Sequence, residues 1–264
     1  MRQTESFDYD YILKCCNGVF NDAFDANACL KILLQIGEYR KAGYKGLECS
    51  PAFYNTVCRA MIRASIMDVA RIYDQDGKSI SLRTINNYCG RFAGSFPDEI
   101  ETVYNASDGT IDRELRPLRY KITPKEMACI TKEGLLQKID DIKKEYAVFG
   151  LDSSGSLEVT VSAEELFYLY SNRIKSLSEA IGRIEEQRNK RYAHNDRLTL
   201  FDYDSLIEEN KVTFNDLDNL ISLALDYTGS VIALLTGEYK AREFFNIDDL
   251  SNTLQLVRKA KQKE

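Results

Sequence analysis

The only histidine among the 264 residues, His194, follows Arg188 by six positions in the basic run RNKRYAH. An imidazole has an unperturbed pKa of about 6.5, so it can both accept and donate a proton near neutral pH. A guanidinium keeps its positive charge and forms paired hydrogen bonds with phosphate or carboxylate oxygens. A histidine this close to an arginine predicts acid–base chemistry beside an anion.

An amphipathic helix is expected to carry this run. Ser162 and Glu165 form a capping box, and apolar residues then recur at steps of four or three. These residues are Leu166, Tyr170, Ile174, Leu177, Ile181 and Ile184. The next positions on the seam are Arg188, Arg191 and Asn195, and burying an unpaired arginine there would be costly. Either the helix leaves the core at Arg188, or its arginines face an interface or an anionic ligand.

Helical geometry limits what one copy of the chain can do. Residues six apart lie about 120° apart around a straight helix, so Arg188 and His194 would not converge on one substrate atom. Lys190 and Arg191, four and three positions back, would lie beside His194 instead. A complete site needs an irregular helix end or a second copy that supplies the missing groups across a two-fold axis. The second option makes a homodimer part of the expected mechanism.

The pattern Arg188-Asn189, four further residues and His194 resembles the signature of the HEPN superfamily. Extended to Asp196, the run is similar to the abortive-infection AbiU-type branch of that superfamily. A second block, residues 65–74 followed by the serine-bearing segment 79–85, resembles a helix and turn of the same branch.

Three charged residues of that second block, Asp68, Arg71 and Asp74, lie three or six positions apart. Pairing of these charges along one helix explains them, and we predict no catalytic role for them.

The resemblance implies a helical bundle that dimerises with the motif at its interface, and a metal-independent endoribonuclease. In such an enzyme the RNA 2′-hydroxyl attacks the neighbouring phosphate. His194 would act as general base or acid, Arg188 would stabilise charge on the phosphoryl oxygens, and Asn189 would hydrogen-bond the substrate or orient a neighbour. Lys190, Arg191 and Arg197 would attract the RNA backbone. Neither a metal ion nor an organic cofactor is expected.

The resemblance further implies a toxin of phage defence, by abortive infection, or of toxin–antitoxin growth control, restrained by an antitoxin or another partner protein. Some HEPN proteins are controlled by a nucleotidyltransferase that modifies a tyrosine two places after the motif histidine. Asp196 occupies that place, so this control is not expected. The alternatives are a non-catalytic HEPN-like binding, antitoxin or scaffold protein, and a helical interaction protein in which His194 only forms hydrogen bonds.

Composition narrows the class of protein. A net charge of −6 argues against a protein that coats nucleic acid through a broad basic surface, though not against a small basic site. The seven cysteines show no C-x-x-C spacing, and with one histidine they give a zinc site little support. We expect reduced, mostly buried thiols in a soluble cytoplasmic protein. The N-terminus lacks the layout of a signal peptide. The most apolar stretch, Leu220 to Leu235, contains Asp226 and Gly229 and is too short to predict a membrane span.

Helix signals predict one all-α domain over residues 1–264, a single-domain helical bundle of the HEPN type with additional helices. Helices are expected over the first forty residues and the last fifteen, and over 51–76, 82–105, 123–146, 162 onward and 213–234. Thr123 with Glu126 and Thr213 with Asp216 provide capping boxes at the start of two of these helices. Leu157–Val161 alternates like a strand but has no evident partner, so we expect a linker or a small edge feature.

Overall fold

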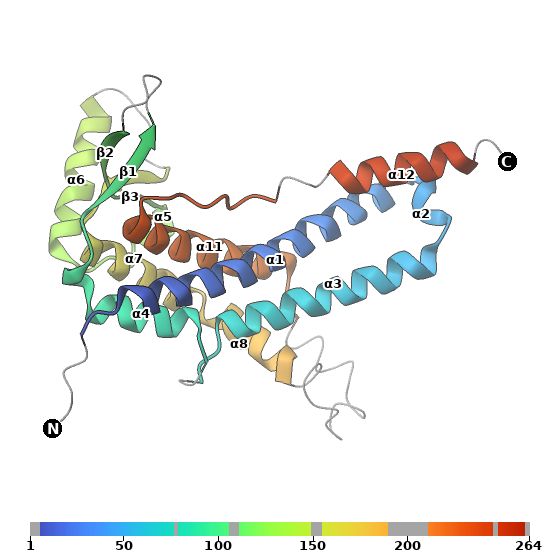
Figure 1. Ribbon diagram of the computed structural model, residues 1–264, viewed down its shortest axis with the longest axis horizontal. Helices are drawn as coiled ribbons and strands as arrows, with labels where there is room; N and C mark the ends of the chain where they lie inside the picture. The colour runs from blue at the N-terminus through green and yellow to red at the C-terminus, as the bar shows by residue number, and fades with distance from the viewer. Residues whose placement is uncertain are drawn as a thin grey trace. The chain divides into compact units, whose positions relative to one another are not determined.

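The structure is a computed structural model that describes residues 6–76, 79–105, 111–148, 155–189, 211–244 and 248–261. The chain folds into two compact units. Unit 1 comprises Met1–Asn17, Arg83–Ser178 and Tyr227–Lys240, and unit 2 comprises Gly18–Leu82, Glu179–Asp226 and Ala241–Glu264. Helices dominate both units (Figure 1), which confirms the predicted all-α class. That the whole chain forms one domain stays a prediction.

Unit 1 combines helices with two small sheets. Its helices are the first turns of α1 (Tyr9–Lys41), most of α4 (Leu82–Arg91), the 3-10 turn η1 (Ala93–Ser95), α5 (Pro124–Met127), α6 (Glu133–Val148), α7 (Ala163–Ser176) and the end of α11 (Phe214–Thr236). The capping box of Thr123 and Glu126 is confirmed, but it opens only the single turn α5, and α6 starts six residues later.

The strands correct one expectation and decide between the alternatives of another. β1 (Glu99–Asn105) pairs antiparallel with β2 (Ile111–Pro117), so the helix expected over 82–105 ends at Arg91. β3 (Arg119–Ile122) pairs antiparallel with β4 (Leu157–Thr160) in a two-stranded sheet, so this segment is the small edge feature and not the linker. Both strands alternate between buried and exposed side chains, because one face packs on the core and the other meets solvent.

The core of unit 1 is centred on Tyr227, which is fully buried. Its ring stacks on Tyr170 with centroids 4.3 Å apart, and its hydroxyl donates a hydrogen bond to Asn86 Oδ1 at 3.1 Å. Beside it, burial raises the pKa of Cys89 to about 12 and the pKa of Cys16 well above its usual value. Both side chains are therefore neutral thiols that pack like small apolar residues.

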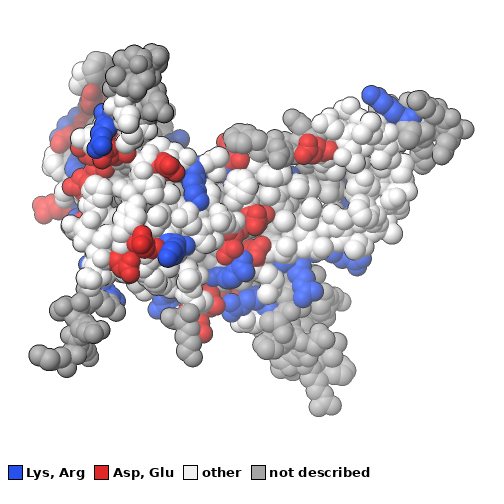
Figure 2. All heavy atoms as spheres, viewed as in Figure 1, with Lys and Arg blue, Asp and Glu red and all other residues white. Residues whose placement is uncertain are grey.

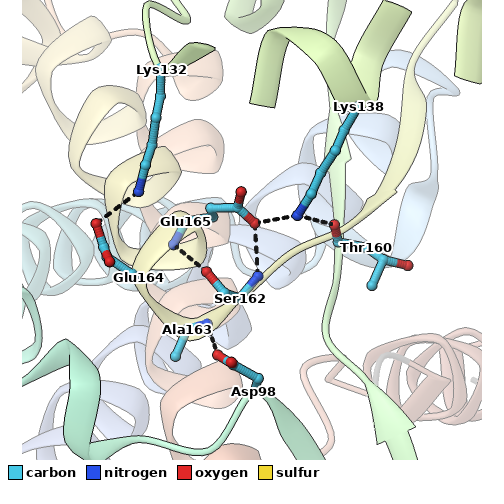
Figure 3. A network of polar contacts seen from close by, with 8 residues as sticks. All are labelled: Asp98, Lys132, Lys138, Thr160, Ser162, Ala163, Glu164 and Glu165. Carbon is cyan, nitrogen blue, oxygen red and sulfur yellow. Dashed lines mark hydrogen bonds and ion pairs between the residues drawn. The ribbon is translucent and has the colours of Figure 1, made fainter. Parts of the chain in front are cut away.

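The start of α7 is held by a polar network (Figure 3). Ser162 and Glu165 form the predicted capping box, and Lys138 of α6 reaches Glu165 Oε2 at 2.7 Å and the Thr160 carbonyl at 3.3 Å. Burial would raise the pKa of Glu165, but hydrogen bonds from Lys138 and Ser162 outweigh it and lower that pKa. Asp98 accepts a further hydrogen bond from the first N–H group of α7 at 2.8 Å.

Unit 2 pairs α1 with α3 (Pro51–Ile72) in antiparallel fashion. Arg40 of α1 donates to Asn55 of α3 at 2.8 Å, and at the other end Arg71 of α3 pairs with Asp22 of α1 at 2.7 Å. The C-terminal half of α3 buries apolar residues, whereas no side chain of its first fourteen residues, 51–64, is fully buried.

A small apolar cluster in unit 2 buries Ile36, Leu47 and Leu254. These residues come from α1, from α2 (Lys45–Glu48) and from α12 (Asp248–Lys261), which lie together in Figure 1. Among its described residues, unit 2 also contains α8 (Ser178–Gln187) and the start of α11.

Among the described helices, α11 is the one long and apolar enough to cross a membrane. It has 23 residues and is longer than the apolar stretch expected from the sequence. However, 67% of its apolar window is buried inside the protein. Its role as a core helix accounts for this composition.

Candidate active site

Helix α8 leads into the predicted motif. The sequence predicted one continuous helix from Ser162 onward, but α7 ends at Ser176 and Leu177 is non-helical, with φ −101° and ψ 11°. The prediction is wrong at this point, because the apolar spacing continues across Leu177 and conceals the break. α8 begins at Ser178, directly after this one non-helical residue.

Two kinds of contact fix α8 in unit 2. Ile181 and Ile184 are buried, and Ile184 is fully inaccessible. Arg183 pairs with Asp216 at 2.7 Å, and Asp216 forms the predicted capping box with Thr213 at the start of α11. Burial would raise the pKa of Asp216, but hydrogen bonds from Thr213 and Arg183 outweigh it and lower that pKa. An ionised carboxylate therefore ties α8 to the first turn of α11.

Arg188 and Asn189 are the last described residues of this segment, and their backbone winds in a π-helical turn. Such turns are rare in proteins as a whole, and those that occur often lie at functional sites. The turn ends the regular α-helical geometry at the first two residues of the motif. Arg188 Nε donates a hydrogen bond to Asn189 Oδ1 at 3.0 Å.

The guanidinium of Arg188 has an acidic partner, Asp74, in the loop that follows α3. Arg188 Nη1 lies 3.6 Å from Asp74 Oδ2, and each side chain is 24% exposed. The backbone N–H of Asp76 lowers the pKa of Asp74, and Ser79 and Arg188 add to this effect. Asp74 is therefore ionised at neutral pH and holds Arg188 at the surface of unit 2.

The same loop contacts α8 at a second point. Gln75 donates a hydrogen bond to Glu185 at 3.3 Å, one turn before Arg188. Tyr73, buried at the end of α3, donates to the Leu220 carbonyl of α11 at 2.7 Å. The loop is thus anchored on one side by a core hydrogen bond and on the other by α8.

The structure places Arg188 in a setting that neither interpretation of the arginine on the seam described, an ion pair within the chain. Arg188 is neither a freely solvated charge nor an unpaired buried one, because Asp74 and Asn189 hold it in a half-buried position. A guanidinium has five N–H donors, and these two contacts engage only part of them. The arrangement can therefore present a fixed cation to an anionic group.

The structure brings together Arg188, Asn189 and Asp74. The other predicted site residues lie outside the described residues, and their roles stay predictions. They are His194, Lys190, Arg191 and Arg197. Within the described ranges, no group of three or more His, Cys, Asp or Glu side chains could hold a metal ion.

A family model described as AbiU2, of the HEPN type, matches residues 17–122 and 133–253, which is most of the chain. The chain belongs to the HEPN AbiU2 family. This confirms the resemblance based on the motif. The two matched segments of this AbiU2 family member contain Asp74 and the run 188–194, respectively. The chain matches no curated protein and no solved structure.

Asp74 is the site residue that the sequence analysis missed. Pairing along the helix holds for Asp68 and Arg71, which lie 3.1 Å apart, but Asp74 follows the end of α3 and pairs with Arg188 instead. The signal was available in the second block of family resemblance, which ends at Asp74. That block could not reveal the contact between Asp74 and Arg188, because the two residues are far apart in the sequence.

Proposed function

We propose that the protein is a metal-independent endoribonuclease toxin that acts in phage defence by abortive infection or in toxin–antitoxin growth control. Membership of the HEPN AbiU2 family supports the defence context. The observation that carries the proposed activity is the half-buried Arg188, fixed by Asp74 and Asn189 at the end of α8. A cation held in this way suits the charge that develops on a phosphoryl group.

In the proposed reaction, the RNA 2′-oxygen forms a bond to the adjacent phosphorus while the bond to the 5′-oxygen breaks. The products are a 2′,3′-cyclic phosphate and a 5′-hydroxyl end. His194 takes the proton from the 2′-hydroxyl or gives one to the leaving oxygen, as its pKa allows. Arg188 neutralises the phosphoryl oxygens, and Asn189 hydrogen-bonds the substrate or, as its contact suggests, orients Arg188.

We propose a homodimer with a composite site, in which Arg188 of one copy acts with His194 of the other. Lys190, Arg191 and Arg197 attract the RNA locally although the chain has a net charge of −6. The proposed setting is the cytoplasm, with an antitoxin or other partner protein as restraint.

The test is purified protein incubated with cellular RNA, beside Arg188→Ala and His194→Ala. We expect wild-type cleavage that leaves 5′-hydroxyl ends, and loss of at least about a hundredfold in rate in both variants. Arg116→Ala, an exposed arginine of β2, is the matched control and should retain activity. Cleavage that persists in both motif variants would contradict the mechanism. If wild type cuts no RNA and arrests no growth, the non-catalytic HEPN scaffold is the better account.

A further inference from the structure

One face of α3 carries arginines without acidic neighbours along the helix. Asn55, Arg59 and Arg63 are spaced four residues apart, so they follow one another along this face, and all three are exposed. No acidic residue occurs between Glu48 and Asp68, in a chain with a net charge of −6. This half of α3 is thus a basic strip on an acidic protein.

A third arginine joins the strip from α1. The exposed side chain of Arg40 reaches across and donates to Asn55 Oδ1 at 2.8 Å, which places a guanidinium one turn before Arg59. Neither Arg40 nor Arg59 forms an ion pair with a described residue. Figure 2 shows Lys and Arg atoms at intervals along the lower edge of α3.

We propose that Arg40, Arg59 and Arg63, the arginine track, bind the sugar–phosphate backbone of single-stranded RNA that flanks the cleavage site. The proposal rests on the proposed ribonuclease function. The track presents guanidinium and amide groups, which can donate hydrogen bonds to phosphate and sugar oxygens. Guanidinium groups in a row fit a regularly charged polyanion.

The position of the track relative to Arg188 defines its role. α3 ends at Ile72, two residues before the Asp74 that contacts Arg188. At a rise of 1.5 Å per residue, Arg63 and Arg59 lie about 14 and 20 Å along the axis from that end. An arginine side chain cannot span this distance to a phosphate held at Arg188. The track would therefore hold neighbouring nucleotides, and its effect should depend on RNA length.

The test measures binding apart from cleavage. His194→Ala protein is titrated into fluorescently labelled single-stranded RNA of about 20 nucleotides and of about four nucleotides. Adding R40A, R59A and R63A should weaken binding of the long RNA at least about tenfold and reduce the salt dependence of log K by about 2. Binding of the short RNA should not change. Alanine is compatible with all three helical positions, so the fold should persist.

A variant with K121A, K125A and K144A removes the same charge from exposed residues of unit 1 and should bind both RNAs as before. Unchanged affinity of the track variant for long RNA would overturn the proposal, as would an equal loss in the charge-matched control. Dissociation of an oligomer with unchanged RNA affinity would also overturn it and would assign this face to a protein contact. Track-dependent binding without cleavage by wild type would instead refute the nuclease and leave the track standing.

Discussion

Asp74→Asn removes the charge that faces Arg188 and retains an oxygen that can accept the N–H of Asp76. Two unit charges 3.6 Å apart attract by about 5 kcal/mol at an effective dielectric constant of 20 and by about 1 kcal/mol in water. Because both side chains are 24% exposed, desolvation and screening reduce this to a net attraction of about 1–2 kcal/mol. If this energy positions the guanidinium for catalysis, the variant should cleave RNA about 5- to 30-fold more slowly.

The assay is single-turnover cleavage at saturating protein, which isolates the chemical step from binding. Asp74 acts through Arg188, so Asp74→Asn should have no further effect in an Arg188→Ala background. Asp68→Asn is the matched control, because it removes a carboxylate of α3 that pairs with Arg71 and not with Arg188. An unchanged rate in Asp74→Asn, or effects of the two substitutions that simply add, would refute the positioning role.

Three further predictions concern unit 1. Glu165→Gln should lower the free energy of unfolding by about 1–2 kcal/mol at neutral pH, because it loses the ionic contact with Lys138. In wild type this stabilisation is complete above the usual pKa of 4.5 and is lost as pH falls through the lower pKa of the folded state. Below pH 4.5, the free energy of unfolding measured in urea should therefore change less with pH in the variant than in wild type. In native protein at mildly alkaline pH, iodoacetamide should label the exposed Cys129 and leave Cys89 unlabelled, because Cys89 is buried and has a pKa of about 12. Mass spectrometry identifies the labelled residues, and labelling of Cys89 in the native protein would contradict its burial. Gly237→Ala should lower the free energy of unfolding by at least about 2 kcal/mol in the same assay, because φ is +74° and the new Cβ would lie 1.9 Å from a backbone oxygen of β1. A variant as stable as wild type would count against that close approach.

Local signals predicted local structure well. The capping boxes at Thr123, Ser162 and Thr213 were all confirmed, because each depends on contacts within one helical turn. Strands β1 and β2 were missed, since a strand is stabilised by a partner and not by its own turn. The break at Leu177 was hidden because one non-helical residue left the apolar spacing intact.

The candidate site was only half predictable for the same reason. Arg188 and Asn189 were predicted from residue type and spacing, and family membership confirms the resemblance from which their roles were inferred. The partner of Arg188, Asp74, lies on another element, and only folding brings the two within 3.6 Å. A sequence pattern could mark both blocks without showing that they meet.

The composite site is tested most directly by mixing two inactive variants. Arg188→Ala and His194→Ala proteins are prepared separately, unfolded and refolded together, and assayed for RNA cleavage. If Arg188 of one copy acts with His194 of the other, half of the randomly formed dimers contain one intact site, and the mixture should recover about a quarter of wild-type activity. Each variant refolded alone should stay inactive. Recovery of no activity, from mixed dimers shown to have formed, would contradict a site shared between two copies.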